Sequence, residues 1–161
     1  MRRKDREIVD RAKIYRIVDS AKILHMGLAD GDYPYIVPLH YGFEYLDESD
    51  SYVFYMHGAK SGHKLDLIEK SANAFIELET DVELLSGGDD PCEYSSFYAS
   101  FMGRGQASVV QNEFEKEKAL KLLMKNQTAR DFEFTQQMIA SAAVIKVVVK
   151  DYTAKAKSGT L

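Results

Sequence analysis

The segment His57–Lys64 concentrates residue types that can hold a phosphate group. It contains two glycines, one serine, two lysines and two histidines. The aromatic run Tyr52–Met56 before it favours a strand, and apolar residues at helical spacing after it favour a helix. Glycines let backbone N–H groups approach an anion, a helix start adds the positive end of its dipole, and the serine and lysines add a hydroxyl group and charge. The segment therefore predicts a phosphate site between a strand and a helix.

The pattern alone leaves a purely structural interpretation open. Glycine-containing loops join strands to helices in many folds, and this spacing matches neither the P-loop nor the Rossmann fingerprint. The four histidines show no HxH or HExxH spacing, and a single cysteine offers only one soft ligand. We therefore expect no metal site. No Ser-His-Asp or Cys-His arrangement can be argued from spacing, because such groups meet in space.

Composition excludes several classes of partner and location. The net charge is −4 and the pI is about 5.6, with basic and acidic residues interspersed, so binding to nucleic acid is not expected. No apolar run is long enough to cross a membrane. The single cysteine, Cys92, cannot form an internal disulfide, which suits a reducing cytoplasm. We expect a cytoplasmic protein.

The length of 161 residues predicts one domain spanning residues 1–161. Residues 1–9 are basic at first and then mixed, and no apolar signal segment follows them, so they are expected to form a solvated arm. The tail at residues 153–161 carries no strong apolar pattern and is expected to be frayed.

Six antiparallel strands and two or three helices are expected along this domain. The strands are predicted at residues 23–28, 35–45, 52–56, 74–79, 95–110 and 142–149. Asp10 and Asn112 are expected to cap helices. Pro38 is expected to lie on an edge strand or at a bulge, because proline has no N–H to donate. Gly103 and Gly105 are expected to interrupt the long fifth strand. This pattern predicts a mainly β fold, an antiparallel barrel of about six strands with flanking helices, rather than a doubly wound sheet; the resemblance described below implies that the barrel is a six-stranded split β-barrel.

A barrel of about six strands is filled by its own side chains, because room for one small ligand needs about eight strands. Most of the aromatic residues between Tyr35 and Tyr55 are therefore expected to be core. Any cofactor is expected to bind outside the barrel, in a surface groove or at a subunit interface.

Several motifs resemble one known family in the same order along the chain. They are residues 1–7, Tyr35–Gly42, His57–Ile68, Tyr98–Ala107 with its Gly-x-Gly strand, and Leu123–Lys125. Together they resemble the nitroimidazole-resistance (Nim) type of the pyridoxamine phosphate oxidase-like split-barrel flavoproteins. The resemblance implies a homodimer with FMN in a cleft between its two subunits, and FAD is the alternative cofactor.

The resemblance also implies which residues contact the cofactor. The phosphate is expected near Ser61, His63 and Lys64, with Lys60 beside them. The isoalloxazine ring is expected to border Val37, Pro38, Leu39 and His40. Further contacts are expected from Tyr55, Met56, Gly58 and Ala59. His57 is expected to face the substrate as the catalytic residue, because an imidazole beside a flavin can donate a hydrogen bond or a proton to a nitro or carbonyl oxygen.

Two positions differ from the pattern of the family. His63 stands where an arginine is common, and Ala99 stands where an arginine follows Tyr98 in Nim-like sequences. The resemblance implies an FMN-dependent oxidoreductase that reduces a small nitroaromatic substrate. The alternatives are a non-catalytic flavin- or haem-binding module, with His40 or His57 as axial ligand, and a pyridoxamine phosphate oxidase-like enzyme.

Overall fold

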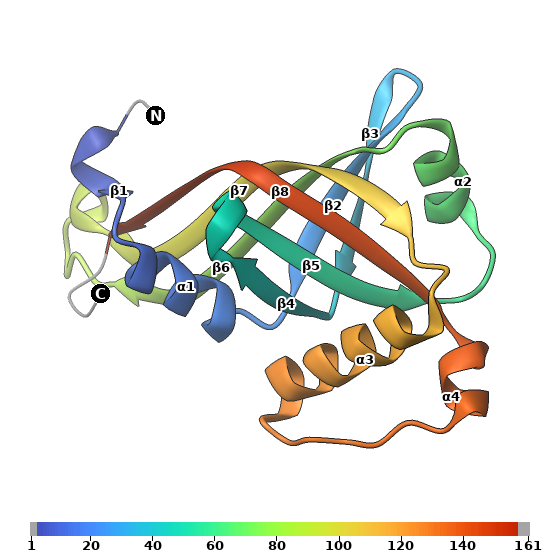
Figure 1. Ribbon diagram of the computed structural model, residues 1–161. Coiled ribbons are helices and arrows are strands. Elements are labelled where there is room, and N and C mark those ends of the chain that lie inside the picture. The colour runs from blue at the N-terminus through green and yellow to red at the C-terminus, as the bar shows by residue number, and fades with distance from the viewer. Residues whose placement is uncertain (1–2, 158–161) are drawn as a thin grey trace.

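The computed structural model describes residues 3–157 and is dominated by one antiparallel sheet (Figure 1). Its strands are β1 (Glu7–Ile8), β2 (Leu24–Asp30), β3 (Tyr33–Leu39), β4 (Tyr41–Leu46), β5 (Ser51–Gly58), β6 (Asn73–Leu85), β7 (Ser95–Val109) and β8 (Ala143–Lys157). The α-helices are α1 (Arg11–Ser20), α2 (His63–Lys70), α3 (Glu113–Thr128) and α4 (Gln136–Ser141). Short 3-10 turns lie at Lys4–Arg6, Asp47–Ser49 and Pro91–Glu93.

The order of the strands explains why the sheet curls into a barrel. Hydrogen bonding runs β3-β2-β6-β7-β8-β5-β4, so β3 and β4 are the two ends of the path. Only His40 separates these two strands in the sequence. The sheet must therefore bend until its two edges meet at His40, where the chain passes from one edge to the other. This arrangement is a split barrel.

The prediction of six strands was wrong in number. The segment expected as one strand from Tyr35 to Tyr45 is divided at His40 into β3 and β4, because the chain changes sheet edge there. The short strand β1 adds another. The prediction that Pro38 lies on an edge strand is confirmed, since β3 pairs only with β2. The expected interruption near Gly103 and Gly105 is a shift of the β7–β8 register between Arg104 and Gly105.

The expectations for both ends of the chain need correction. The tail is not frayed as far as Lys157, because residues 153–157 continue β8 and pair with β7. Ala154 is buried in this segment. Because the buried side chain is small, the sequence here lacks the large apolar residues from which a strand is usually predicted. The arm is not wholly solvated either, because Glu7 and Ile8 pair with Lys155 and Ala154. Residues 1–2 and 158–161 lie outside the described residues.

Aromatic side chains fill the inside of the barrel. Tyr41, Tyr52, Phe54 and Phe101 are essentially inaccessible to solvent, and their rings contact one another with centroids 5.2–6.1 Å apart. These contacts confirm that most of the predicted aromatic wall is core. Side chains therefore fill the barrel interior, although the expectation had rested on six strands and the sheet has eight.

The two predicted helix caps are confirmed. The side chain of Asp10 accepts a hydrogen bond from the backbone N–H of Lys13, and that of Asn112 accepts one from Glu115. Helix α3 then packs on β4, α4 follows it, and a second cluster of buried apolar residues lies between these helices and β5 and β8 (Figure 1). The caps fix where the peripheral helices begin.

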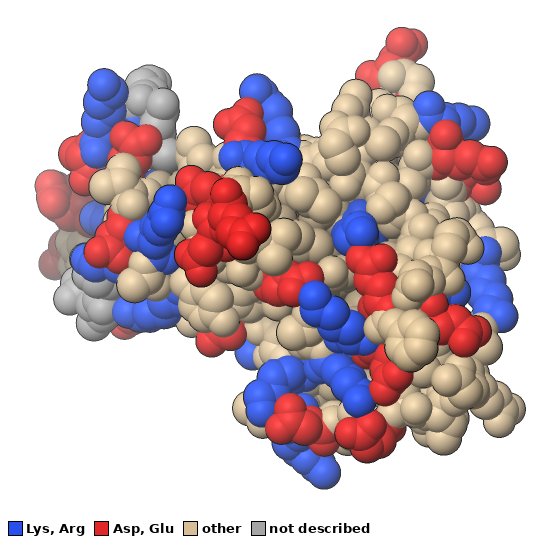
Figure 2. All heavy atoms as spheres, viewed as in Figure 1, with Lys and Arg blue, Asp and Glu red and all other residues tan. Residues whose placement is uncertain are grey.

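The surface carries mixed charge. On the face shown in Figure 2, lysine and arginine side chains alternate with aspartate and glutamate rather than forming a single basic patch. Among the described residues, no helix is long and apolar enough to cross a membrane.

Candidate functional site

The predicted phosphate segment forms the passage from β5 into α2. Gly62 precedes the helix with a φ of 135°, which L side chains rarely adopt, and no side chain caps the helix. The backbone N–H groups of Leu65 and Asp66 bond to the carbonyl oxygen of Gly62 at 2.8 and 3.3 Å. The first turn is thus formed, and the positive end of the helix dipole faces the loop.

Four polar side chains around this helix start have no polar partner among the described residues. Within residues 3–157, the side chains of His57, Lys60, Ser61 and Lys64 form no hydrogen bond or ion pair. The side-chain end of Lys64 lies against Gly58, since a Cβ atom at Gly58 would be 3.0 Å from both its Cε and Nζ atoms. His57, Lys60 and Ser61 are exposed. The arrangement offers two positive charges, a hydroxyl group and backbone N–H groups to one anion.

His63 contacts residues of the β2–β3 hairpin instead of facing the predicted phosphate site. Its Nε2 atom lies 2.6 Å from the Oδ2 atom of Asp30, and its ring meets that of Tyr35 edge-on at 5.1 Å. Both partners belong to the β2–β3 hairpin, so His63 ties α2 to the tip of that hairpin. To contact a phosphate as predicted, the His63 side chain would have to break its contact with Asp30 or contact Asp30 and the phosphate together.

In the segment predicted to border the flavin ring, residues 37–40, half-buried and exposed side chains alternate. Val37 and Leu39 are half-buried and pack against the core, whereas Pro38 and His40 are exposed. The Nδ1 atom of His40 lies 3.2 Å from the backbone oxygen of Lys22 and 2.9 Å from Oε1 of Gln127. Pro38 is therefore the side chain of this segment that is open to a ligand without competing hydrogen bonds.

The topology brings the two predicted halves of the site to one end of the barrel. Tyr41 pairs with Met56 in the antiparallel β4–β5 register, so His40 and His57 flank the same end of this strand pair. The ring-binding strand and the phosphate segment are thus neighbours, although 17 positions separate His40 from His57 in the sequence.

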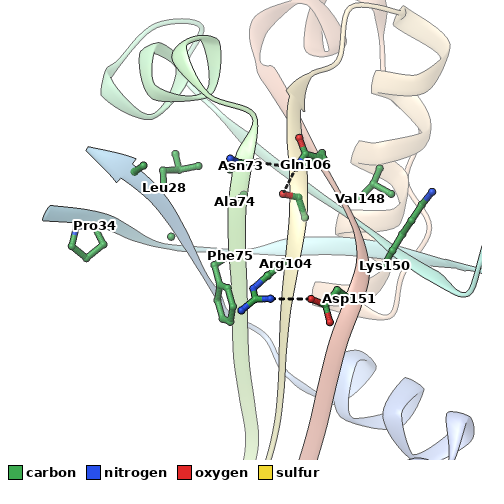
Figure 3. A pocket seen from close by; sticks show the side chains of 13 residues that line it. Leu28, Pro34, Asn73, Ala74, Phe75, Arg104, Gln106, Val148, Lys150 and Asp151 are labelled. Carbon is green, nitrogen blue, oxygen red and sulfur yellow. Dashed lines mark hydrogen bonds and ion pairs between the residues drawn. The ribbon is translucent and has the colours of Figure 1, made fainter. Parts of the chain in front are cut away.

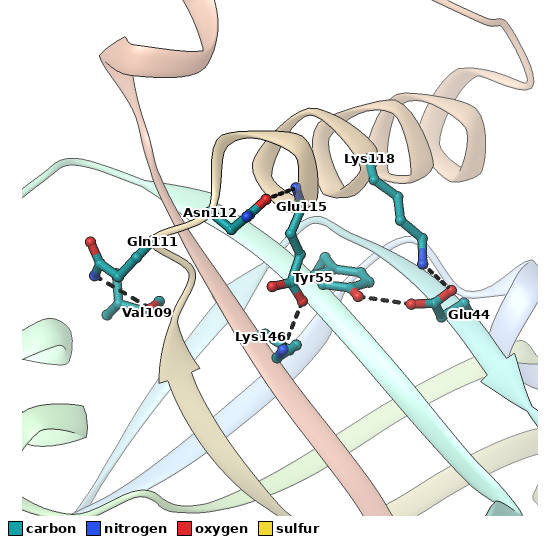
Figure 4. A network of polar contacts seen from close by, with 8 residues as sticks. All are labelled: Glu44, Tyr55, Val109, Gln111, Asn112, Glu115, Lys118 and Lys146. Carbon is teal, nitrogen blue, oxygen red and sulfur yellow. Dashed lines mark hydrogen bonds and ion pairs between the residues drawn. The ribbon is translucent and has the colours of Figure 1, made fainter.

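Tyr55 and Met56 are buried inside the chain, unlike the other predicted contacts. The hydroxyl group of Tyr55 donates to Glu44, which also pairs with Lys118 of α3, while Glu115 pairs with Lys146 of β8 (Figure 4). Burial and the Glu44 carboxylate raise the pKa of Tyr55. These side chains hold α3 on the sheet. The backbone at Tyr55 and Met56 is paired with β4 on one side and β8 on the other, so the structure does not present these two predicted contacts to a cofactor.

Two of the hollows on the described surface bear on a ligand site. One, of about 560 Å³, lies beside the phosphate segment and is lined by Lys60 and Ser61 together with α2 and the end of β7. The other is an open groove of about 950 Å³ on the outer face of the sheet. Phe75 and Arg104 lie side by side in this groove, and Arg104 pairs with Asp151 at its edge (Figure 3).

No residue predicted from the sequence as a site residue lines the larger groove. Its polar side chains include Arg104, Gln106 and Lys150, and its apolar floor includes Gly27 and Phe75. The alternation in β7 and β8 could have marked these outward positions. That alternation could not show that five strands line one groove, because the groove depends on the pairing of β2 with β3 and β6, and of β7 with β6 and β8. Ala99 lies in the buried core, away from both hollows.

Comparison with known proteins assigns the fold to a family. A family model described as pyridoxamine 5'-phosphate oxidase matches residues 10–156, which is most of the chain. The chain belongs to this family. No curated protein matches the chain.

Solved structures place the chain among split-barrel proteins of the pyridoxamine 5'-phosphate oxidase type. A candidate 5-nitroimidazole antibiotic resistance protein from Bacteroides thetaiotaomicron is 27% identical with a TM-score of 0.77, over 93% of this chain and 86% of that one. The flavocytochrome Anf3 from Azotobacter vinelandii is 17% identical (TM-score 0.76; 99% and 72% covered). An FAD- and haem-binding protein from Mycobacterium smegmatis is 18% identical (TM-score 0.75; 96% and 74% covered). The Nim-like resemblance is thereby confirmed at the level of fold and family.

Proposed function

We propose that this member of the pyridoxamine 5'-phosphate oxidase family is an FMN-dependent oxidoreductase that holds the cofactor phosphate at the start of α2. The observation that carries the proposal is the uncapped helix start surrounded by the uncommitted side chains of Lys60, Ser61 and Lys64. A phosphate dianion is the ligand that suits these donors, since each charged hydrogen bond contributes about 1.5–3 kcal/mol.

The remaining contacts suit a flat ring next to that phosphate. Bound FMN would supply the electron-transfer chemistry, and the protein would supply orientation and protons. Exposed Pro38 offers an apolar surface without a donor, and His57 is exposed with no partner among residues 3–157. An imidazole nitrogen of His57 is free to hold a proton and donate it to a nitro or carbonyl oxygen of a substrate.

The proposed site needs a second copy of the chain to enclose it. The outer face of the sheet exposes large apolar side chains, with Ile36 at 61% and both Phe75 and Met102 at 38% exposure, around the groove of about 950 Å³. Contiguous apolar surface of this kind is typical of an interface. We therefore propose a homodimer formed through this face, with FMN at its margin, so that each subunit shields the cofactor of the other from water.

A nitroaromatic compound is the proposed substrate class. The likeness to the Bacteroides protein named for 5-nitroimidazole resistance supports this class, and the exposed position of His57 supports a small substrate approaching from solvent. The test is an anaerobic assay in which FMN-loaded protein is mixed with NADH or NADPH and then with a nitroimidazole. Bleaching by the donor and recovery with the nitro compound would support the proposal. A flavin that neither donor reduces would contradict it.

Oxidation of pyridoxamine phosphate is the weaker alternative. Its phosphorylated substrate needs a second cationic site, and the groove offers Arg104 and Lys150. Arg104 already pairs with Asp151, at 3.3 Å, so the local charge is partly neutralised. If added pyridoxamine phosphate bleached the flavin, this alternative would replace the nitroaromatic one.

A flavin- or haem-binding module without catalysis is the other alternative. The names of two fold neighbours include FAD, haem or a flavocytochrome, and His57 is free to bind an axial position, whereas Nδ1 of His40 is engaged. A Soret band after haem titration, together with a failure to retain flavin, would favour this alternative.

A further inference from the structure

One cluster of metal-ligating side chains lies outside the proposed flavin site. His25 of β2 and Glu77 of β6 are paired in the sheet register, and Glu79 follows two residues along β6 on the same face. The Nδ1 atom of His25 lies 3.0 Å from Oε2 of Glu77. One ligand atom from each of the three residues lies within 4.8 Å of the other two.

The two carboxylates of this cluster have no cationic neighbour to balance them. Among residues 3–157, no lysine or arginine forms an ion pair with Glu77 or Glu79. One half-buried carboxylate (Glu77) and one exposed carboxylate (Glu79) beside a histidine, without a Lys or Arg partner among the described residues, form a site of negative charge that a cation would stabilise.

The ligand set points to a transition metal rather than to Mg²⁺ or Ca²⁺. Imidazole nitrogen with carboxylate oxygens is a typical combination for Zn²⁺ and related ions, whereas Mg²⁺ and Ca²⁺ prefer oxygen alone. We propose that His25, Glu77 and Glu79 bind a divalent transition-metal ion such as Zn²⁺ on the outer face of the sheet. Three protein ligands on an exposed surface leave the remaining position open to water or to a further ligand.

The geometry of the cluster needs only side-chain adjustment to bind such an ion. Metal–ligand distances of about 2.0–2.2 Å imply neighbouring ligand atoms about 3.3–3.6 Å apart in a tetrahedral site. The His25–Glu77 separation of 3.0 Å is already near this value, and Glu79 must close from at most 4.8 Å. Both strands lie inside the sheet, so their backbones are fixed and the ligands are held on one face.

The site would adjoin the larger groove. Gly27 and Phe75 line the groove, and they lie two residues along β2 and β6 from His25 and Glu77. Glu77 pairs with Met102 in the β6–β7 register, so a bound ion would place a positive charge within the face that we propose as the dimer interface. No sequence pattern indicated this site, since His25 and Glu77 are 52 positions apart and no two histidines share a ligand spacing.

The test is titration of the full-length, untagged and chelator-treated protein with Co²⁺, followed by visible absorption and by calorimetry with Zn²⁺. We expect one ion per chain and a Co²⁺ spectrum that changes with protein binding. Glu79→Gln, at an exposed position, should weaken binding at least about tenfold without loss of fold, and His25→Ala should weaken it further. Circular dichroism and thermal unfolding check that each variant is folded.

Two control variants test whether the ion binds at this cluster rather than at other carboxylate or histidine side chains of the protein. Glu83→Gln removes another exposed carboxylate of β6, and His57→Ala removes the free histidine of the flavin site. Neither should change the affinity for Zn²⁺ or Co²⁺. The proposal is overturned if the wild type binds neither ion at micromolar concentration. It is overturned equally if His25→Ala and Glu79→Gln bind as tightly as the wild type, or if His57→Ala abolishes binding.

Discussion

A methyl group at Gly58 would lie 3.0 Å from both Cε and Nζ of Lys64, so the end of the lysine side chain rests against the backbone of Gly58. Gly58 is the last residue of β5, and Lys64 is in the first turn of α2. The missing side chain at position 58 therefore leaves space for the ammonium group that we propose as a phosphate ligand.

Gly58→Ala should weaken FMN binding with little effect on folding. The added methyl group meets the flexible end of a lysine, which can move away at low cost, but moving displaces its charge from the proposed phosphate site. Loss of one charged hydrogen bond, about 1.5–3 kcal/mol, corresponds to at least about tenfold in affinity. Fluorescence titration of FMN measures the affinity, and urea unfolding measures the stability.

A double-mutant cycle checks that this effect passes through Lys64. Lys64→Ala alone should weaken FMN binding, and adding Gly58→Ala to it should cost almost nothing more. If the two losses of FMN affinity were fully additive, Gly58 would act on the cofactor by another route, such as direct contact between the Gly58 backbone and FMN.

Asp30→Asn should strengthen FMN binding. This substitution removes a negative charge that lies 2.6 Å from His63, and it frees that imidazole for the phosphate. The same titration measures the change, with Asp32→Asn in the adjacent turn as a control for general charge. Weaker binding by Asp30→Asn would show instead that the His63–Asp30 contact is needed to hold the loop in place.

Gly42→Ala should destabilise the fold strongly. A Cβ atom there would lie 2.2 Å from the backbone nitrogen of Leu123, so α3 would have to move away from β4. Overpacking of this kind costs about 1–3 kcal/mol and more where backbone blocks the space. Gly27→Ala is the matched control, because its Cβ would meet Phe75 at an ordinary 3.7 Å. Equal unfolding midpoints in urea for both variants would contradict the close packing of α3.

Asp50 should contribute stability that depends on pH. Hydrogen bonds from the hydroxyl groups of Tyr45 and Tyr152, at 2.6 and 2.8 Å, lower the pKa of its carboxyl group. Because the pKa is lower in the folded state, this stability is present above the unfolded value of about 3.9 and is lost as pH falls through the folded pKa.

Asp50→Ala should therefore have a lower urea midpoint than the wild type at pH 7, and the difference should shrink between about pH 4 and pH 2. Asp47→Ala, in the same turn, should show no such trend. A constant difference across this pH range would mean that the carboxylate charge contributes nothing.

Local chemistry explains which elements could be predicted from the sequence. Asp10 and Asn112 act within their own turns, and Pro38 excludes a second strand partner through its own missing N–H, so these features did not depend on the rest of the fold. The division at His40 was not predictable in the same way. Apolar alternation continues through it, and only the tertiary pairing of Tyr41 with Met56 reveals that the chain has changed edge.

The candidate site was predictable only in part, for a related reason. The residues of the phosphate segment are consecutive, so their residue types alone suggested an anion site. The contact of His63 with Asp30 joins positions 33 apart, and the burial of Met56 depends on the packing of the whole barrel. Long-range contacts of this kind decide which side chains are free to bind a ligand.

The central claim is that the start of α2 binds the FMN phosphate, and FMN titration of the wild type, Lys64→Gln and Lys70→Gln tests it most directly. Lys70 lies at the other end of the same helix and serves as the matched control. The account predicts saturable binding by the wild type and by Lys70→Gln, with affinity at least about tenfold lower for Lys64→Gln. Equal affinities for all three proteins, or no binding of FMN by the wild type at micromolar concentration, would contradict it.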